Sequence, residues 1–189
     1  CRSAVPVRYP AAGDSAKPAG RVLRVGPGRP YATPAAAARA ARSGDTVEID
    51  ASAYPSGSAL WPQDGLTIRG VGAGPADRTR VTASPRGIQD RDVWLFTGDD
   101  VRIENVEISG ARAGSSRNGA AIRHMGRNLV LRNVYLHDNE NGLLTGDRAP
   151  ESEVLIEHSE FADNGFGDGL SHNIYVGKVQ NVLPGMEAA

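Results

Sequence analysis

The chain of 189 residues carries 21 basic and 22 acidic side chains, which gives a formal net charge of −1. This length corresponds to one domain, and the balanced charge gives no reason to expect a nucleic acid or an anionic membrane as a partner. No run approaches the roughly 18 apolar residues of a membrane-spanning helix. The 23 glycines and the low aromatic content of 5% favour a fold with many tight turns and a narrow core.

The chain has one cysteine, Cys1, so it contains no internal disulfide. A cysteine at the first position resembles the mature end of a bacterial lipoprotein, where the thiol is lipidated. Residues 1–20 are rich in Ala, Pro and Gly and are predicted to be a flexible linker. The resemblance implies lipidation at Cys1, an extracytoplasmic location, and membrane contact through the lipid anchor alone. The alternative is an arbitrary boundary of the sequence.

The first predicted elements are a strand at 22–25, a helix over 34–42 and a strand at 46–49. Thr33 is a good N-cap, Pro34 fits the first helical position, and the alanines that follow favour helix. Gly44 is expected at the left-handed position after the helix.

The rest of the chain repeats. The segments 101–108, 129–136 and 154–161 align without gaps, and 66–71 is a weaker copy. A second series consists of 118–122, 141–144 and 172–176, with 93–96 leading it. Units this short leave no room for helical crossovers, so like strands are predicted to stack in parallel. The two-residue period of a strand directs one set of apolar side chains inward: Val101, Ile103, Ile108, Leu129, Leu131, Leu136, Val154, Ile156 and Phe161.

Two columns across the repeats support this register. Asn105, Asn133 and His158 fall in one column, where stacked amides can hydrogen-bond and satisfy backbone groups at a bend. The neighbouring outward column alternates in sign, which is favourable between adjacent strands. It consists of Arg69, Glu104, Arg132 and Glu157.

The asparagine column and the repeats resemble the pectate-lyase-like superfamily. The resemblance covers about residues 21–178 and implies an all-β fold, a right-handed parallel β-helix (a solenoid) with a short N-terminal capping α-helix. The expected division of the chain is a linker at 1–20, the β-helix at 21–178 and a C-terminal tail at 179–189.

Members of this superfamily with known activity act mostly on polysaccharides, especially acidic ones, in a groove along the outside of a parallel sheet. The resemblance therefore implies a protein that acts on or binds polysaccharide, as a lyase or a glycoside hydrolase. The alternative is a non-catalytic glycan-binding or structural surface protein. A lyase needs a cation or Ca²⁺ that neutralises the uronate carboxylate, a Lys, Arg or His base and an acid, whereas a hydrolase needs paired carboxylates. Whether the chain is an enzyme stays open at this point.

The richest polar segment is 163–173, and its neighbour in the preceding repeat is 137–141. Asp138 aligns with Asp163, so these two carboxylates form a candidate Ca²⁺ site, although Asp is also favoured in tight turns. His172 is a candidate base with Asp168 as the residue that orients it. Asn139 is a candidate for substrate binding, and His158 is expected to be structural.

A second group of candidates follows the apolar strand at 118–122. Arg123 and Lys178 are candidates for catalysis, as a base or as a carboxylate-binding cation, and His124 is a candidate for substrate binding. The alternative is a solvated surface. The outward trio of Ala121, Leu144 and Tyr175 is expected either to stack on a sugar, with Tyr175 as the platform, or to pack under a loop.

No closing helix follows the last predicted strand. A terminal repeat without a cap presents unpaired strand edges and apolar side chains, so the chain is expected to associate end to end or to be marginally stable. The tail residues available to cover this end are Val179, Val182, Leu183 and Met186. The native protein is also expected to be longer.

Overall fold

The computed structural model describes residues 20–73, 75–113, 118–146, 152–165, 169–177 and 181–185. The described residues form one short α-helix, α1 (Pro34–Ala40), a 3₁₀ turn at Pro75–Asp77, and strands that belong to three sheets. Within this part of the chain, no helix is long and apolar enough to span a membrane.

Each sheet is composed of parallel strands. Sheet A has seven strands: β1 (Val22–Val25), β2 (Thr46–Ile49), β5 (Thr67–Gly70), β8 (Val101–Glu104), β11 (Leu129–Arg132), β14 (Glu153–Glu157) and β17 (Asn181–Gly185). Sheet B has five: β3 (Ala53–Tyr54), β6 (Thr79–Thr82), β9 (Val106–Ser109), β12 (Tyr135–His137) and β15 (Glu160–Ala162). Sheet C has five: β4 (Ala59–Trp61), β7 (Trp94–Phe96), β10 (Ala120–His124), β13 (Asn141–Thr145) and β16 (Ile174–Tyr175).

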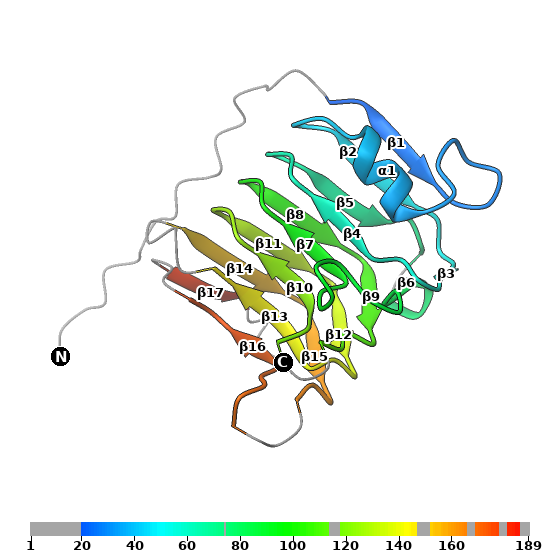
Figure 1. Cartoon of the computed structure of the whole chain (residues 1–189). Helices are drawn as coiled ribbons and strands as arrows, with labels where there is room; N and C mark the ends of the chain where they lie inside the picture. The colour runs from blue at the N-terminus through cyan, green and yellow to red at the C-terminus, as the bar shows by residue number, and fades with distance from the viewer. Residues whose placement is uncertain are drawn as a thin grey trace.

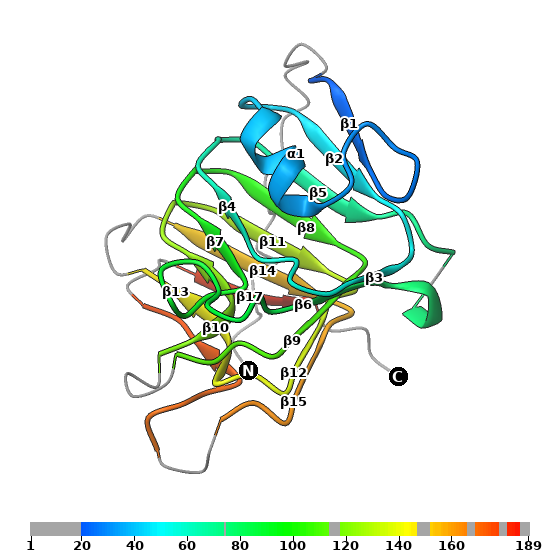
Figure 2. The ribbon, with the colours of Figure 1, turned by 45° about the vertical axis from the view of Figure 1, so that its right-hand side comes forward.

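From β2 onward, the chain visits sheets A, B and C in the same order in every repeat. The strands therefore lie in stacked layers, from α1 (blue) at one end to β15, β16 and β17 (orange to red) at the other (Figure 1). Sheet C lies on the face turned toward the viewer in Figure 1, and Figure 2 shows the three sheets from the side. This all-β arrangement is compatible with a parallel β-helix.

The predicted register of the first repeat series is confirmed. Leu131 pairs with Ile103 on one side and with Ile156 on the other. Ile103 and Leu131 are fully buried, whereas Ile156 near the C-terminal end is partly buried. The largest core side chains form an aromatic cluster in which Trp61 stacks on Phe96 and meets Trp94 edge to face, with centroids 6.1 and 5.9 Å apart.

The predicted start of the helix is confirmed, but the predicted helix extends too far at its C-terminal end. Thr33 caps α1, and its hydroxyl accepts a hydrogen bond from the Ala36 amide at 3.2 Å. The helix ends at Ala40 rather than at residue 42, since Ala41 is already extended. The Asp45 carboxylate binds the Arg42 amide at 2.8 Å, which holds residues 42–45 in a turn instead of a further helical turn.

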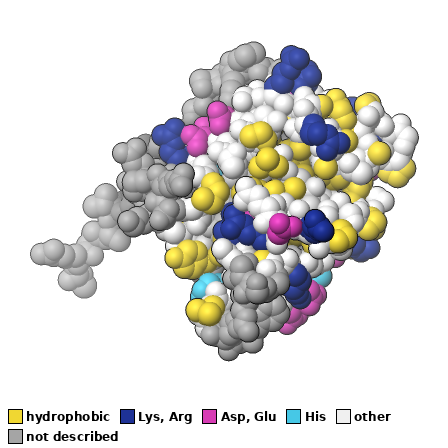
Figure 3. Space-filling view, viewed as in Figure 1, with side chains coloured by type: hydrophobic (Ala, Val, Ile, Leu, Met, Phe, Trp, Pro, Cys, Tyr) yellow, Lys and Arg dark blue, Asp and Glu magenta, His cyan; other side chains and the backbone are white. Residues whose placement is uncertain are grey.

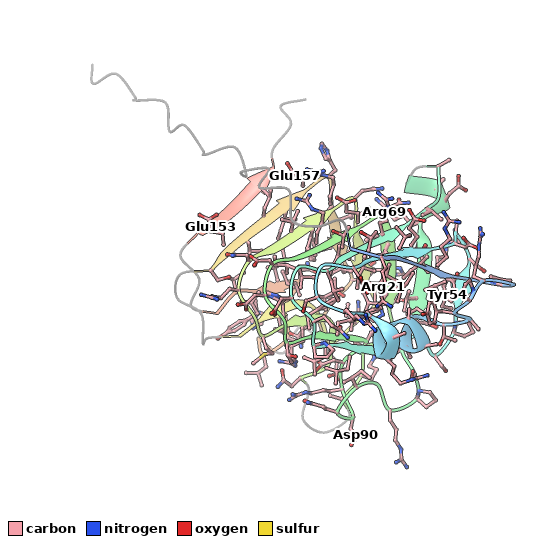
Figure 4. All side chains as sticks on the ribbon, turned by 90° about the horizontal axis from the view of Figure 1, so that it is seen from above. Arg21, Tyr54, Arg69, Asp90, Glu153 and Glu157 are labelled. Atoms are coloured by element: carbon pink, nitrogen blue, oxygen red, sulfur yellow. The ribbon has the colours of Figure 1, made fainter. Side chains whose placement is uncertain are left out.

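The alternating charges on the outside of sheet A are confirmed. Arg132 contacts Glu157 at 2.5 Å and Glu104 at 3.7 Å, and Arg69 contacts Glu48 at 2.6 Å. Arg24 lies opposite Glu48, so the column extends to the first strand. Figure 4 shows Arg69 and Glu157 on the same side of the molecule. Exposed pairs of this kind contribute little individually, about 0–1 kcal/mol each, but they favour the observed strand register over a shifted one.

The asparagine column is confirmed as a hydrogen-bonded ladder. The Asn133 amide donates to Asn105 Oδ1 at 2.7 Å, and the Asn105 amide donates to the Gly70 carbonyl at 2.9 Å. Both asparagines have left-handed backbones, with φ of 51° and 55°, as does His158 in the next repeat. Arg78 closes the ladder by donating to Asn133 Oδ1 at 2.6 Å.

The described structure departs from the sequence alignment in two places. β10 pairs with β13 two residues away from the predicted alignment, so Arg123 rather than Ala121 lies opposite Leu144. Loops of different length precede the two strands, so an alignment of the sequence segments from their first residues does not reveal this offset. In addition, β17 pairs in parallel with β14, so residues assigned to the C-terminal tail add a strand to sheet A.

Leu131→Asp is expected to abolish the cooperative unfolding transition, because the new carboxylate would lie unpaired in the core between Ile103 and Ile156. Val130→Asp is the matched control, since Val130 lies on the outer side of the same strand and is partly exposed. The control is expected to change the unfolding free energy by less than about 1 kcal/mol. Circular dichroism during thermal unfolding measures both, and similar losses in the two variants would contradict the assigned faces.

Asn133→Ala is expected to lower the unfolding free energy by about 2–4 kcal/mol, because it removes ladder hydrogen bonds and forces alanine into a left-handed conformation. Asn133→Gly separates the two effects, because glycine adopts this conformation without strain. It is expected to be less harmful by about 1 kcal/mol in urea denaturation. Equal losses would show that the backbone conformation contributes nothing.

Candidate functional site

The candidate site is a pocket of about 350 Å³ on the outer face of sheet C. Its walls come from the last three strands of the sheet and from described residues that precede or follow them. The lining residues are Asn118, Arg123, Met125, Asn141, Leu144, Thr145, Gly146, Leu170, His172 and Tyr175. Three of these, Arg123, His172 and Tyr175, are site residues predicted from the sequence.

The floor of the pocket is part of a row of side chains that crosses the outer face of sheet C. Register places Leu60, Leu95, Arg123, Leu144 and Tyr175 side by side on successive strands. The two ends of the row are open to solvent, with Leu60 43% and Tyr175 51% exposed. The middle is buried, with Leu95 2%, Arg123 9% and Leu144 6% exposed. Of the two alternatives for the outward trio, sugar stacking or packing under a loop, stacking is open to Tyr175, which is exposed, whereas Leu144 is buried.

Arg123 is held on two sides. Its Nε donates to Asp92 Oδ2 at 2.8 Å, and its Nη2 donates to the Asn118 carbonyl and to Asn118 Oδ1. The Asp92 side chain is fully buried. The alternative of a solvated Arg123 is therefore wrong, because this guanidinium forms a buried ion pair and reaches the pocket with only 11% of its side chain exposed.

Asp92 is a buried carboxylate surrounded by donors. Arg91 Nε lies 3.2 Å from Oδ2, and the Ala120 amide donates to Oδ1 at 3.2 Å. Burial raises the pKa of Asp92 above its usual range, against the opposing effect of the hydrogen bond and charge of Arg123. Removing either partner of such a pair leaves an uncompensated charge, which costs several kcal/mol, about 3–5 in measured cases.

Side chains of the next repeat bind Gly119, which directly precedes β10. The buried Glu140 side chain accepts a hydrogen bond from the Gly119 backbone amide at 2.6 Å, and the Asn141 side-chain Nδ2 donates to the Gly119 carbonyl at 3.1 Å. Asn118, which binds Arg123, is therefore attached to a rigid segment.

His172 and Tyr175 form the outer wall of the pocket. Their rings are stacked, with centroids 5.6 Å apart and planes 26° apart. The His172 amide donates to Asn141 Oδ1 at 2.9 Å, which joins this wall to β13. A flat, partly exposed aromatic pair beside a cation is a surface on which a sugar ring can stack.

Asn139 has a structural position rather than a place in the pocket. It is 1% exposed and belongs to a second amide ladder, in which its Nδ2 donates to Asn164 Oδ1 at 2.9 Å and its Oδ1 accepts from the Ala111 amide. The prediction of substrate binding by Asn139 is not supported by this burial. Asn139 instead satisfies backbone groups at the corner between sheets B and C.

Asp138 and Asp163 lie at equivalent corner positions of adjacent repeats, as predicted. Both are exposed and have left-handed backbones, with φ of 54° and 52°. Asp138 Oδ2 contacts His137 Nδ1 at 2.7 Å. Among the described residues there is no group of three or more His, Cys, Asp and Glu side chains that could hold a metal ion. Calcium binding by the two aspartates stays a prediction, and their backbone conformation already accounts for their residue type.

His124 lies inside the protein, 1% exposed, where its Nε2 contacts the Gly98 carbonyl at 3.2 Å. It pairs with Phe96 and Thr145 in sheet C. The expected surface position of His124 is therefore wrong, and the side chain has no route to a substrate in the pocket. Its neighbour Arg123 lies on the other face of the strand.

Three further predicted site residues, Cys1, Asp168 and Lys178, lie outside the described residues. Asp92 and Asn118 were missed by sequence reasoning. A signal for Asp92 does exist in the sequence, because a lone carboxylate directly precedes the apolar strand 93–96. Its partner Arg123 is 31 residues away, so only the strand register brings the two together.

The comparisons with known proteins give no relative from which a function could be transferred. No family model, no curated protein and no solved structure matches the chain. The functional argument therefore depends on the geometry of the pocket.

Burial lowers the pKa of His124 from 6.5 to about 4. An unfolded chain takes up this proton near pH 6.5 and the folded protein only near pH 4. The stabilisation is thus complete above pH 6.5 and is lost as the pH falls toward 4, about 3 kcal/mol in total.

His124→Gln is expected to remove this part of the acid sensitivity, because glutamine retains a donor for the Gly98 carbonyl but does not titrate. Urea denaturation between pH 4 and 8 is the measurement, and the expected result is that the wild-type and variant curves converge as the pH falls. Parallel curves over this range would contradict a buried neutral His124.

Proposed function

We propose that the chain is a right-handed parallel β-helix similar to the pectate-lyase-like superfamily, with α1 as its N-terminal cap. The constant A–B–C order of the strands and the ladder of Asn105 and Asn133 support this fold. Support for the cap comes from α1, which packs against β1 and β4 at the end of the stack that carries the first strands (Figures 1 and 2).

We propose that the protein binds an acidic polysaccharide at the pocket on sheet C. The observation that carries this proposal is Arg123, a cation that lines the pocket next to an exposed aromatic wall. A guanidinium recognises a sugar carboxylate, and an aromatic ring stacks on the apolar face of the same sugar. Basic side chains (dark blue) lie on either side of an acidic one near the centre of this face in Figure 3, with hydrophobic side chains around them.

Binding fits the pocket better than cleavage does. The described lining residues include Arg123 and His172 but no Asp or Glu, so the described part of the pocket contains no paired carboxylates of the kind that a glycoside hydrolase uses. Arg123 is committed to Asp92 and Asn118, which makes it a better anchor for a carboxylate than a base. His172 is the side chain that keeps a lyase as the second candidate, since a partly exposed histidine can accept a proton.

An extracytoplasmic location belongs to the same proposal. Polysaccharides of this type lie outside the cytoplasm, and a lipid on Cys1 would hold the protein at a membrane surface beside them. Neither the location nor the anchor contributes to the pocket chemistry.

Tyr175→Ala is expected to weaken the binding of oligogalacturonate about three- to tenfold in isothermal titration calorimetry, because it removes the exposed half of the aromatic wall. Leu60→Ala is the matched control. Leu60 lies in the same outward row and is similarly exposed, but three strands separate it from the strand of Tyr175, and its substitution is expected to leave the affinity unchanged.

Neutral oligogalactan is the ligand control and is expected to bind more weakly than oligogalacturonate to the wild-type protein. Absence of binding to every uronate polymer tested would overturn the proposal in favour of a structural surface protein. New unsaturated chain ends in the incubated polymer would instead identify the protein as a lyase, the second candidate.

A further inference from the structure

The loop between β6 and β7 forms a small hairpin that covers the middle of sheet C. Ile88 and Asp92 are bridged by two backbone hydrogen bonds, of 2.6 and 3.0 Å. Gln89 and Asp90 at its tip both have left-handed backbones, with φ of 54° and 59°. Such a conformation is unfavourable for residues other than glycine, so the surrounding contacts must hold it in place. Figure 4 shows Asp90 projecting from the molecule on the side opposite Arg69.

The base of this hairpin places Asp92 against Arg123, which lines the pocket. The carboxylate is fully buried and meets three donors from two repeats: Arg123 and Arg91 at Oδ2, and the Ala120 amide at Oδ1. The charged groups at this place are two arginines, Asp92 and the buried Glu140, whose carboxylate accepts from the neighbouring Gly119 amide. Arg91 is the more exposed of the two cations, with 32% of its side chain accessible, and it also donates to Gln89 Oε1 at 2.8 Å.

The contacts of Arg123 leave one end of its guanidinium available. Nε is used by Asp92 and Nη2 by Asn118, whereas Nη1 has no hydrogen-bond partner among the described residues. A guanidinium is planar, so fixing two of its nitrogens also fixes the direction of the third. Arg123 lines the pocket, and Nη1 is the donor that a ligand can still engage.

We propose that Asp92 is the positioning residue of the anion site and also its internal counter-ion. Its carboxylate holds Arg123 in the orientation that a sugar carboxylate needs, and its negative charge weakens the attraction of the pocket for that carboxylate. The inference rests on the proposed function and adds an account of how the affinity of the site is set.

The two effects of Asp92 depend on different properties of its side chain, namely its hydrogen-bonding shape and its charge. Orientation depends on the hydrogen bond between Asp92 Oδ2 and Arg123 Nε, which an uncharged acceptor of the same shape can replace. Repulsion depends on the charge alone and acts over several ångströms in a site with a low effective dielectric constant. Removing the charge while retaining the shape therefore separates the counter-ion role from a purely structural one.

Asp92→Asn is expected to bind oligogalacturonate about three- to tenfold more tightly than the wild-type protein at low ionic strength. The difference is expected to shrink in high salt, where charge interactions are screened, and the affinity for neutral oligogalactan is expected to stay the same. Asparagine satisfies fewer of the three donors, so the Asp92→Asn protein without ligand is expected to melt at a lower temperature than the wild type. Because it binds uronate more tightly, a uronate is expected to raise its Tm by more than it raises the Tm of the wild type.

Asp90→Asn is the matched control. It removes the same charge from the same hairpin, but at the exposed tip, and it is expected to leave the affinity unchanged. A folded Asp92→Asn protein with equal or weaker affinity for oligogalacturonate would overturn the inference while leaving the proposed function intact.

The remaining outcomes are also decisive. If the wild-type protein binds no uronate polymer, the proposed function fails, and the inference is then decided by whether galacturonate raises the Tm of Asp92→Asn more than that of the wild type. If Asp92→Asn does not fold, the double variant Asp92→Asn/Arg123→Gln replaces the ion pair by a neutral pair. This protein is expected to bind uronate and neutral oligomers equally, and a retained preference for uronate would contradict the inference.

Discussion

The path of the chain from one sheet to the next depends on single residues in the left-handed conformation at the corners. Equivalent corners carry this conformation in successive repeats, and they form three columns along the stack. The columns are Asn105, Asn133 and His158; Gly110, Asp138 and Asp163; and Gly44, Gly65, Asp100 and Asn128. Only Gly, Asn, Asp and His occupy these positions, which are the residues that tolerate a positive φ at the smallest cost. Each short strand can then end after two to five residues and the next can begin in a new direction.

Polar side chains at the same corners, partly or fully buried, satisfy the backbone groups that the bends leave without strand partners. Asn139 and Asn164 do so between sheets B and C, as Asn105 and Asn133 do between sheets A and B. This distinguishes the corners from the pocket. Polar residues are abundant at corners because the fold needs them there, whereas the pocket is defined by Arg123, a charged residue within a strand whose other members are buried.

The sequence was sufficient to predict the features that repeat. The parallel register of β8, β11 and β14, the Asn105–Asn133 ladder and the Arg–Glu column follow from a fixed offset, because stacked strands bring equivalent residues together. The site was less predictable, since it is composed of features that do not repeat. The loops before β10 and β13 differ in length, so the register that places Arg123 opposite Leu144 was missed. Alternation places His124 on the same face as Ile122, but the burial of Arg123 on the opposite face could not be inferred from it, because every residue of β10 is buried.

The covered outer face of sheet C explains why a charged pair is found there. A sheet face that is open to water tolerates an unpaired arginine, but Arg123 is only 9% exposed, with Asp92 of the hairpin at 88–92 and Asn118 both bound to its guanidinium. A guanidinium in such a place must be compensated, and Asp92 provides the compensation from the hairpin that does the covering. The loop, its carboxylate and the arginine therefore form a single unit. A longer or shorter hairpin would move the counter-ion relative to Arg123, so the length of this loop affects the strength with which the pocket can attract an anion.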